Sequence, residues 1–448
     1  MTASGEPAAA QVQDDFVPIA VAELELASGA AAPLPNALGQ IVLLVRVHGV
    51  PLGSLPLLEP GAASLHEDLR RLALATFRDP LRKHLALDGL ALPADGEDIP
   101  GPQACSSVHQ QSAHKVSVIV CTIGEDPRVV QTVQSILDQN HENLELIVVD
   151  NRPGTGKVNE LLAGVSDPRF RLVPQPRPGL SAARNAGLRA ATGTLVAYTD
   201  DDAFADPDWV HRLARPFEEH PEVVCTTGLV LPAEIATRAQ AWFEEFGAFD
   251  KGFERQVWAA VSRPDLATLG TPGEGGVLFP FSAGVYGSGN NMAFRRSWLL
   301  AQDLFDEALG AGTVARGGED LDAFLTVMLA GGVLVYEPRA IVRHYARSDL
   351  VTLRKQMFGY GSGMAAVVVK HFVSNPRRAA QITARLPAGV RKLLDPGSEK
   401  NASKSATYPV ELARSELAGY AAGPALYLRS RREARRRHRA YPGGGPGN

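Results

Sequence analysis

The sequence predicts an α/β fold: a mostly parallel sheet flanked by helices. From Lys115 onwards, short apolar runs alternate with amphipathic segments, which is the order of strands and helices in such a sheet. One apolar run, residues 195–198, leads directly into three carboxylates, Asp200, Asp201 and Asp202. The carboxyl ends of the strands form the ligand crevice of an open α/β sheet. The acidic residues are therefore expected where a ligand binds.

Composition places the chain among ordinary globular proteins. Hydrophobic residues make up 45% and charged residues 21% of the 448 positions, which allows two or three domains. The formal net charge of -4 gives no general attraction to nucleic acid, so no nucleic-acid partner is expected. No secretory signal and no bilayer-spanning apolar run are visible. We expect a cytoplasmic protein, at most peripheral on the inner face of the membrane.

Five stretches are predicted along the chain. Their boundaries and characters are 1–15, disordered; 16–92, a small α+β domain; 93–114, a linker; 115–372, the main α/β domain; and 373–448, a helical basic C-terminal region. The small domain shows no chemical constellation, and its histidines are predicted to be solvated or structural: His48, His66 and His84. The cysteines are too few and too scattered for a disulfide framework or a thiolate metal site: Cys105, Cys121 and Cys225.

The main domain begins with strands and helices in alternation. Strands are predicted at 116–122, 144–150, 170–173 and 195–198, and helices at 128–139, 158–165 and 181–191. Each strand is a short apolar run, and each helix carries apolar residues at helical spacing. Because the strands are expected to be parallel, Thr122, Asp150 and Asp200 should open onto the same edge of the sheet.

The acid triplet at residues 200–202 predicts a cation site. Clustered carboxylates suit a hard divalent cation that carries a substrate phosphate, and Mg²⁺ or Mn²⁺ is the expected ion. The alternative is an acidic helix cap, since Asp206-Pro207-Asp208 also has the form of a helix start. One aspartate suffices for a cap, whereas three adjacent ones repel each other, so the cation site is favoured.

A second acidic group follows a pair of glycines. Gly317 and Gly318 form a flexible turn that feeds a helix, with Glu319, Asp320 and Asp322 at its positive end. That location lowers a carboxylate pKa, so that one acid stays ionised and can take a proton from an attacking hydroxyl. The alternative is charge complementarity at a helix N-terminus, and Asp322 is expected to serve only that purpose.

Six motifs in order carry a family resemblance. They are Val118-Ile-Val-Cys-Thr122, Ile147-Val-Val-Asp-Asn151, Gly179-Leu-Ser-Ala-Ala-Arg-Asn-Ala-Gly187, Thr199-Asp-Asp-Asp202, Gly287-Ser-Gly-Asn-Asn-Met-Ala-Phe-Arg295 and Gly317-Gly-Glu-Asp-Leu-Asp322. Together they resemble the inverting glycosyltransferases of family 2, which have the GT-A fold. The resemblance covers about residues 115–372 and leaves the first hundred residues and the C-terminal region unexplained.

The resemblance implies a nucleotide site at the first strand ends. The positions of Thr122 and Asp150 hold the nucleobase in the family, and an aspartate can accept the ring N–H of uracil or thymine, which favours a UDP or dTDP donor. Arg184 corresponds to the family's arginine beside the base. Without the resemblance, the Thr122 hydroxyl could equally form a hydrogen bond within a turn. Arg184 could equally be an ordinary exposed arginine on a helix.

Metal and catalytic roles are also implied by the resemblance. Asp202 corresponds to the principal metal ligand, Asp200 to a residue near ribose and metal, and Asp201 to one that faces the sugar or solvent. Some relatives supply a histidine near the metal at the position of His344, although a lone histidine is more often structural. The base is assigned to Asp320, with Glu319 orienting the acceptor.

Two amides precede the fifth motif's apolar residues. Asn290 and Asn291 can hydrogen-bond the hydroxyls of a donor sugar or an acceptor. Asparagine also occurs wherever a loop needs local backbone bonds, and that alternative stays open.

The C-terminal region ends in a strongly basic segment, with seven arginines among residues 429–439. A basic helix that follows apolar residues can dock on anionic lipid, which would suit a lipid-linked acceptor. A solvated helix or a disordered tail is the alternative, and RNA contact is disfavoured because aromatic residues are sparse.

The predicted activity is a metal-dependent inverting transfer of a hexosyl or deoxyhexosyl group. The donor is a nucleotide diphosphate-sugar, and the acceptor is a hydroxyl of a glycan, a lipid-linked or a small molecule, as in cell-envelope glycan or glycolipid synthesis. A sugar-phosphate nucleotidyltransferase is the first alternative, but it would need a Gly-rich basic phosphate loop that residues 122–128 lack. A non-catalytic nucleotide-sugar-binding protein is the second.

Overall fold

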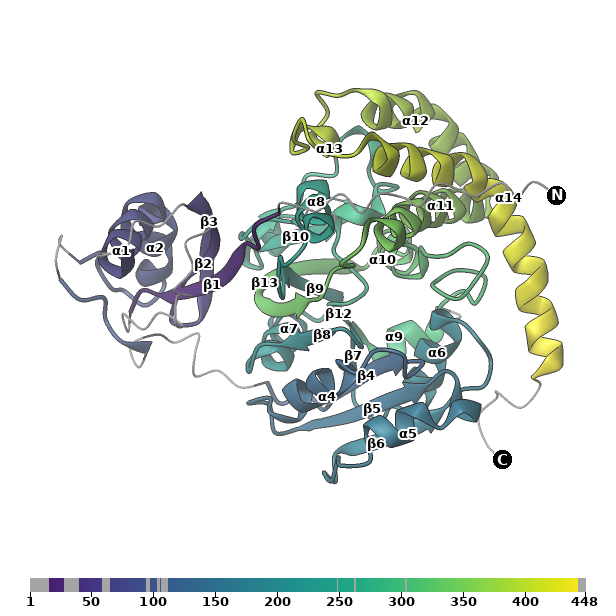
Figure 1. Cartoon of the computed structure of the whole chain (residues 1–448), viewed down its shortest axis with the longest axis horizontal. Coiled ribbons are helices and arrows are strands. Elements are labelled where there is room, and N and C mark those ends of the chain that lie inside the picture. Colours follow the sequence, from purple (N-terminus) through teal and green to yellow (C-terminus); the bar gives the residue numbers. More distant parts are fainter. Residues whose placement is uncertain are drawn as a thin grey trace, which may run out of the picture.

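A computed structural model describes residues 16–27, 40–58, 65–93, 97–102, 105, 112–247, 249–261, 263–302 and 304–441. The predicted disorder of residues 1–15 and much of the predicted linker lie outside these ranges. Figure 1 shows a small N-terminal unit beside a large sheet, with the C-terminal helices along one side of the molecule. The α/β fold, the small N-terminal α+β unit and the helical C-terminal region predicted from the sequence are confirmed.

The N-terminal unit is a three-stranded sheet packed against two helices. Its elements are β1 (Ala20–Glu25), β2 (Ile41–Val47), β3 (Val50–Leu58), α1 (Leu65–Thr76) and α2 (Arg78–Ala86). β1 pairs in parallel with β2, and β2 and β3 form a hairpin. The hairpin turns at His48 and Gly49, whose φ angles of 54° and 73° are left-handed. Leu24, Leu43 and Leu81 lie in its core, which closes one face of the sheet.

The central sheet is mixed. Its strands are β4 (Val116–Thr122), β5 (Leu144–Asp150), β6 (Phe170–Pro174), β7 (Leu195–Asp200), β8 (Ala203–Ala205), β9 (Val223–Pro232), β10 (Gln256–Ala259), β11 (Thr271–Pro272), β12 (Met292–Arg295) and β13 (Val333–His344). The order is β11-β10-β13-β9-β12-β7-β4-β5-β6, and β8 pairs with β13. The half formed by β6, β5, β4 and β7 is parallel, as predicted. β12 runs antiparallel to both β7 and β9 and joins the two halves.

Helices cover both faces of this sheet. They are α4 (Val129–Leu137), α5 (Lys157–Leu161), α6 (Leu180–Ala190), α7 (Trp209–Glu219), α8 (Arg238–Phe246), α9 (Arg296–Ala301) and α10 (Glu319–Leu329), with short 3₁₀ turns η2 (Pro153–Thr155), η3 (Pro264–Thr268), η4 (Gly276–Leu278) and η5 (Ala283–Val285). Along β4, Val118 and Val120 face the core under α4 and α7, whereas Ile119 faces the core under α6 and α10. Burial on both faces explains why the strands are continuous apolar runs rather than alternating ones.

The C-terminal region packs on the main domain. It comprises α11 (Leu350–Ser374), α12 (Pro376–Leu394), α13 (Glu399–Ala402) and α14 (Val410–Ala440). Glycines let the backbones of α11 and α14 approach closely: a Cβ on Gly361 would lie 2.1 Å from the carbonyl oxygen of Glu416. Near the end of α14, the guanidinium of Arg437 donates to the carbonyl of Pro178 at 3.1 Å. The arginine-rich segment is therefore a helix held against the α/β domain.

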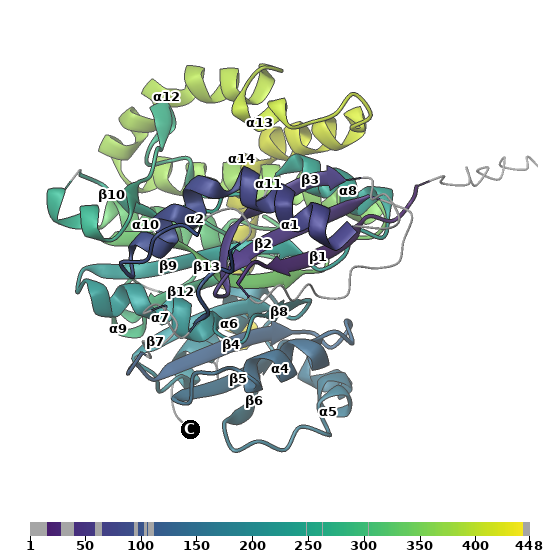
Figure 2. The same ribbon diagram turned by 90° about the vertical axis from the view of Figure 1, so that its left-hand side faces the viewer.

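Ion pairs hold the N-terminal unit against the outer side of β13. Arg46 pairs with Asp206 at 2.6 Å, and Arg343 of β13 pairs with both Glu23 and Asp206. Leu44 of β2 lies in an apolar cluster with residues of β9 and β13. Figure 2 shows this unit in front of the large sheet. Among the described parts of the chain, no helix combines the length and the apolar character needed to cross a membrane.

Candidate active site

Three polar residues end neighbouring strands at one edge of the sheet. Thr122 closes β4 and is the register partner of Asp150, which closes β5, while the preceding Cys121 pairs with Asp200 at the end of β7. The hydroxyl of Thr122 donates to the Asp201 carboxylate at 2.5 Å and accepts the Gly124 N–H at 3.0 Å. The strand ends thus lie together, as the sequence predicted. The Thr122 hydroxyl bonds both the Asp201 carboxylate and the backbone of the turn at Gly124.

Asp150 carries an unsatisfied acceptor. Its side chain is 1% exposed, and Oδ1 accepts the backbone N–H of Arg152 at 2.9 Å. Oδ2 is buried and has no hydrogen-bond partner among the described residues. Leaving a buried polar atom unpaired costs about 1–3 kcal/mol, and more for a charged group. A ligand that presents an N–H to Oδ2 would remove that cost.

The acid triplet is crowded and poorly compensated. Asp202 is 4% exposed, with His344 Nε2 at 3.4 Å and Arg347 NH1 at 3.5 Å from its oxygens. Burial and the neighbouring Asp202 and Asp200 raise the pKa of Asp201 to about 7, against the opposing hydrogen bond from Thr122. Burial likewise raises the pKa of Asp200 and of Asp202. A bound cation would relieve this repulsion.

His344 can act as a neutral ligand beside Asp202. The ring ends β13 and lies edge-on to Phe249, with centroids 5.2 Å apart. Burial lowers the pKa of His344 to about 4, so the imidazole is neutral near pH 7 and has a lone pair to offer. Carboxylate oxygens together with an imidazole nitrogen fit a divalent ion such as Mn²⁺.

The predicted metal ligands do not form a closed cage. Within the described residues, the ligand atoms of Asp200, Asp202 and His344 do not make a set in which all lie within 4.8 Å of one another. An ion held by one or two carboxylates, with substrate phosphate and water completing its shell, needs no such cage. The arrangement therefore fits an ion that arrives with a phosphate-bearing ligand.

Arg184 is a buried bridge rather than an exposed helix residue. From α6, its guanidinium donates to Glu319 at 2.8 Å, to the carbonyl of Gly289 at 3.0 Å and to Asp200 at 3.5 Å. It thereby connects the end of β7 with the start of α10. Burial raises the pKa of Glu319 to about 7 despite the opposing charge of Arg184. For Glu319, burial therefore outweighs the lowering expected at a helix N-terminus.

Asp320 is held by backbone donors. Oδ2 accepts the Gly289 N–H at 2.9 Å, and Oδ1 accepts the Leu321 N–H at 2.8 Å. Only glycine fits at 289, because a Cβ there would lie 2.8 Å from the Cβ of Asp320. Gly318, with a φ of 94°, begins α10 from a left-handed conformation. The two glycine motifs therefore position one carboxylate, which is partly exposed, beside the triplet.

The side-chain amides of Asn290 and Asn291 differ in whether they are free to bind a ligand. Asn291 is fully buried, and its side chain accepts from Trp209 Nε1 at 2.8 Å and donates to the carbonyls of Leu229 and Ala340 at 2.9 Å each. These bonds occupy the amide in joining β12, β9 and β13, so the structure does not support a sugar-binding role for Asn291. Asn290 is 2% exposed, and neither amide atom has a partner within the described chain.

Asp322 is a buried anchor for α11. Lys370 Nζ lies 2.6 Å and His371 Nε2 2.9 Å from its two carboxylate oxygens. Burial alone would raise its pKa, but Lys370 and His371 outweigh burial and lower it. The sequence predicts that Asp322 only complements the charge at the start of α10. In the structure, Asp322 also pairs with Lys370 and His371 of α11.

Two arginines beside the triplet were not predicted. Arg128, at the start of α4, pairs with Asp126 at 2.6 Å and lies 4.6 Å from the ring centre of Tyr345. Arg347 is 43% exposed and contacts Asp202. Their proximity to Thr122 and His344 in sequence was the available signal. Both are suitably charged to contact a diphosphate.

A cavity of about 630 Å³ lies on a different side of α10. Its walls include Glu319, Asp322, Arg189, Arg431 and Arg435, which come from α10, α6 and α14. It shares Glu319 with the candidate site but none of the triplet residues. The acids that suit a cation therefore lie at the sheet edge and not in this cavity.

The fold and this edge define an α/β protein with clustered acids at the ends of its strands. Residues 117–269 match the family model described as Glycosyl transferase family 2. This part of the chain is thus similar to family 2 glycosyltransferases, as the ordered motifs indicated.

Relatives match part of the chain. The glucosyl-dolichyl phosphate glucuronosyltransferase of Haloferax volcanii is 35% identical over 147 residues, 31% of this chain and 47% of the relative. The succinoglycan biosynthesis protein ExoO of Rhizobium meliloti is 28% identical over 239 residues, 53% of this chain and 62% of the relative. The chain thus spans about half the length of these relatives. A solved structure, the mannosyltransferase PcManGT of Pyrobaculum calidifontis in complex with GDP-Man and Mn²⁺, aligns with a TM-score of 0.39 and 17% identity over 72% of this chain and 87% of that one.

Proposed function

We propose that this protein is a metal-dependent inverting glycosyltransferase that uses a pyrimidine nucleotide diphosphate-sugar. The observation that carries the proposal is a group of acids at one edge of the sheet whose charges and acceptor atoms are only partly paired within the described chain. Asp150 leaves a buried carboxylate oxygen without a partner, and the adjacent triplet holds carboxylates with raised pKa values. A uracil or thymine ring, together with a cation that carries a diphosphate, would satisfy both features.

Asp150 and Thr122 would contact the base. The free Oδ2 of Asp150 is an acceptor for the ring N–H that distinguishes uracil and thymine from cytosine. The Thr122 hydroxyl lies on the neighbouring strand end and is already bonded to Asp201. Base recognition and the triplet would thereby be linked through one hydroxyl. Arg184, which is committed to Glu319, Gly289 and Asp200, would position these groups rather than contact the base directly.

Asp202, with Asp200 and His344, would hold the cation. When bound, Mg²⁺ or Mn²⁺ acts as a Lewis acid for the departing diphosphate. Arg347 and Arg128 would add positive charge on the same side. Asp201 would face the sugar.

Asp320 would act as general base. Its carboxylate takes the proton from the acceptor hydroxyl while the hydroxyl oxygen bonds to the anomeric carbon and the bond from that carbon to the diphosphate oxygen breaks. The electron pair of the broken bond leaves with the diphosphate, and a single displacement of this kind inverts the anomeric configuration. Backbone donors from Gly289 and Leu321 keep Asp320 oriented toward the site. Glu319 would orient the neighbouring groups through Arg184, and Asn290 would offer its unpartnered amide to a sugar hydroxyl.

The acceptor is proposed to be lipid-linked. The Haloferax volcanii relative is named for a glucosyl-dolichyl phosphate, which supports this class. On α14, Arg431, Arg432, Arg435 and Arg436 are exposed, so the helix can present positive charge to anionic headgroups. Co-sedimentation with anionic vesicles that decreases with salt would support a peripheral membrane contact, and equal sedimentation with neutral vesicles would argue against it.

The test combines calorimetry and product analysis. UDP- and dTDP-sugars are titrated into the full chain with and without Mn²⁺, and each pair with binding is incubated with lipid-linked and soluble acceptors. Metal-dependent binding followed by release of UDP or dTDP and a glycosylated acceptor supports the proposal. Release of pyrophosphate from a nucleoside triphosphate and a sugar phosphate would identify a nucleotidyltransferase instead. Binding without turnover across the panel would identify a non-catalytic nucleotide-sugar-binding protein.

A further inference from the structure

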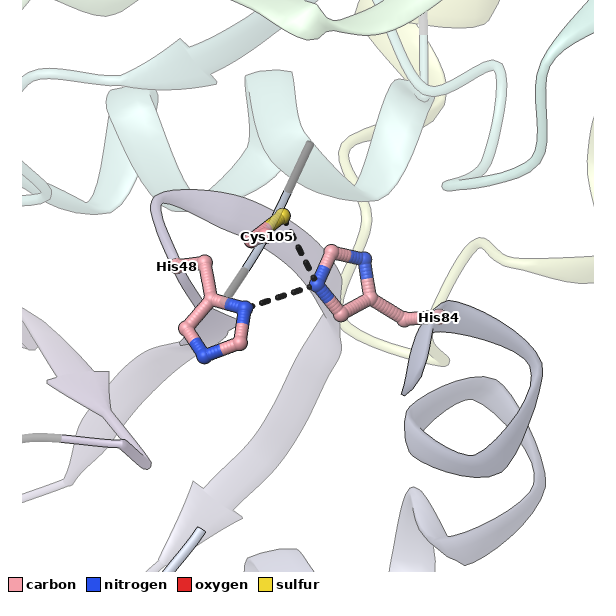
Figure 3. Close-up of side chains that lie close together, drawn as sticks. All are labelled: His48, His84 and Cys105. Carbon is pink, nitrogen blue, oxygen red and sulfur yellow. Dashed lines mark hydrogen bonds between the residues drawn. The ribbon is translucent and has the colours of Figure 1, made fainter. Parts of the chain in front are cut away.

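Two histidines and a cysteine converge in the N-terminal unit. His48 lies at the hairpin turn between β2 and β3, His84 lies in the last turn of α2, and Cys105 lies in the segment that leads to the α/β domain. Their side chains point toward one another (Figure 3). All three are buried, with exposed fractions of 5%, 7% and 0%. Separations of 36 and 21 residues along the chain conceal the cluster in the sequence.

The ligand atoms are spaced like those of a tetrahedral zinc site. His48 Nδ1 lies 3.0 Å from His84 Nε2, and Cys105 Sγ lies 3.6 Å from the same nitrogen. Zinc bonds of about 2.0–2.1 Å to nitrogen and about 2.3 Å to sulfur place tetrahedral ligand atoms about 3.3 Å and about 3.6 Å apart. All three atoms lie within 4.8 Å of one another. The two separations that involve His84 Nε2 are therefore within a few tenths of an ångström of tetrahedral values.

A second hydrogen bond prepares His48 as a ligand. Its Nε2 lies 2.6 Å from the carbonyl oxygen of Pro100, so this nitrogen must carry the proton and donate. The same ring's Nδ1 is then left with a lone pair that faces His84. A histidine ligand that donates its other N–H to a backbone carbonyl is the usual arrangement around protein-bound metals. The backbone of His48 is fixed as well, because its N–H donates to Glu25 at 2.9 Å.

A second cluster of possible metal ligands in the described chain differs in its exposure and in its arginine partner. His220, Glu222 and Asp265 also bring three ligand atoms together, but they are partly or fully exposed. Arg263 pairs with both Glu222 and Asp265, at 2.5 Å for the latter, and thereby supplies the positive charge. Around the buried cluster, no ion pair joins a cation to His48 or His84 among the described residues, although Arg339 lies near enough to add to burial and His48 in lowering the pKa of His84.

We propose that His48, His84 and Cys105 bind one Zn²⁺ through Nδ1, Nε2 and the thiolate, with water or a further ligand in the fourth position. Nitrogen and sulfur donors favour zinc over the hard cation proposed for the sheet edge. The ion ties the hairpin, α2 and the connecting segment together. Ile99 of that segment lies in the core of the N-terminal unit, so zinc would fix the connection between this unit and the α/β domain. Binding at this site is independent of the proposed transferase activity.

The test measures zinc in the full chain. Protein expressed with zinc and dialysed against a weak chelator is analysed by mass spectrometry for metal content, as wild type and as Cys105→Ser, His84→Ala and Cys225→Ala. Cys225 is a matched control, since it is a free cysteine buried in the core of the main domain. We expect one zinc ion per wild-type and Cys225→Ala chain, and at least about 10-fold weaker binding in the other two variants.

Cobalt substitution keeps the proposal testable if a variant fails to fold. Wild-type protein reconstituted with Co²⁺ should show a thiolate-to-cobalt charge-transfer band and the intense visible bands of a tetrahedral site, and Asp202→Ala should retain both. Zinc-free wild-type protein that takes up no Zn²⁺ would overturn the proposal. Zinc that remains bound in a folded Cys105→Ser variant, or cobalt bands without thiolate character, would also overturn it.

Discussion

Two buried glutamates, Glu337 and Glu319, differ in their arginine partners and in the direction of their pKa shifts. Glu337 of β13 is fully buried between Arg339, at 2.6 Å, and Arg255, at 3.2 Å. Burial would raise its pKa, but these arginines outweigh burial and lower the pKa to about 2. Glu319 is also buried, yet it shares its single arginine, Arg184, with Asp200, and its pKa is raised to about 7. Arginines of the chain thus balance the charge of Glu337, whereas the single arginine beside Glu319 and Asp200 does not balance both acids.

The contrast separates structural charge from functional charge. A buried acid whose partners come from the chain contributes to the fold, as at Glu337 and at Asp322 with Lys370. We propose that the acids with raised pKa values at the sheet edge where β7 ends, Asp200, Asp201 and Asp202, instead bind a cation from outside the chain. Oxygen donors dominate that edge, whereas nitrogen and sulfur meet around His84. The two proposed metal sites therefore differ in the ion that they favour and in their purpose.

Removal of the proposed base should have the largest effect. Asp320→Asn preserves the shape and can keep the bond from Gly289, but it removes the proton acceptor. We expect turnover to fall about 10²–10⁴-fold, with nucleotide affinity nearly unchanged. Steady-state kinetics and calorimetry on the same preparation measure both quantities. Undiminished transfer would remove Asp320 from the mechanism.

Loss of the principal metal ligand should follow. Asp202→Ala removes the carboxylate that faces His344, and we expect UDP affinity in the presence of Mn²⁺ to weaken about 10–100-fold. Titration without metal should differ little between this variant and wild type. Asp79→Ala is the control, because that aspartate is exposed on α2 with only a surface pair to Arg82. An unaltered Mn²⁺-dependent titration for Asp202→Ala would exclude it as a ligand.

Deletion of the base-recognition acid should have a moderate effect. Asp150→Ala removes the unpartnered Oδ2, and we expect UDP to bind about 10-fold more weakly. The same variant should discriminate less between UDP and CDP, because the ring N–H of uracil no longer finds its acceptor. Competition between the two nucleotides measures this preference. Retention of full discrimination would mean that another group reads the base.

The smallest expected effect is a pH dependence of stability that distinguishes the two glutamates. Glu319 has a folded pKa of about 7, above its ordinary value of about 4.3, so the folded protein binds the extra proton. Stability should therefore fall as the pH rises from about 4.3 to about 7. Glu337, with a folded pKa of about 2, contributes stability that is complete above about pH 4.3 and is lost as the pH falls toward 2.

Urea denaturation of metal-free protein between pH 5 and 8 checks this difference. In Glu319→Gln the decline with rising pH should be smaller than in wild type, since Asp201, whose pKa is also raised to about 7, still contributes to it. In Glu337→Gln the full decline should persist at lower overall stability. Parallel pH profiles for wild type and Glu319→Gln would show that Glu319 is ionised throughout, and the charge contrast between the regions would fail.

Local pattern was sufficient for the fold and for the strand-end residues. Continuous apolar runs ending in Thr122, Asp150 and Asp200 predicted both the parallel half of the sheet and the shared edge, because strand and side-chain placement there follow from sequence alone. The antiparallel insertion of β12 was not predicted. It depends on pairing between segments about a hundred residues apart, and periodicity carries no information about such pairing.

Long-range contacts explain what the sequence did not reveal. Asn290 and Asn291 are adjacent and chemically identical, yet only the burial of Trp209 against Asn291 shows that the latter is occupied. The burial of Glu319 likewise reversed the pKa shift expected from its helix position. The sequence alone predicts solvated or structural roles for His48 and His84 and no metal site at Cys105. Their convergence required the folded positions of three separate segments.

The proposed nucleotide and metal site can be tested with a crystal soaked with Mn²⁺ and UDP and measured at the manganese absorption edge. We expect an anomalous peak bonded to Asp202 and to the diphosphate, with the uracil N–H directed at Oδ2 of Asp150. Nucleotide density with no manganese at the ends of β4, β5 and β7, or manganese and nucleotide bound elsewhere, would contradict it.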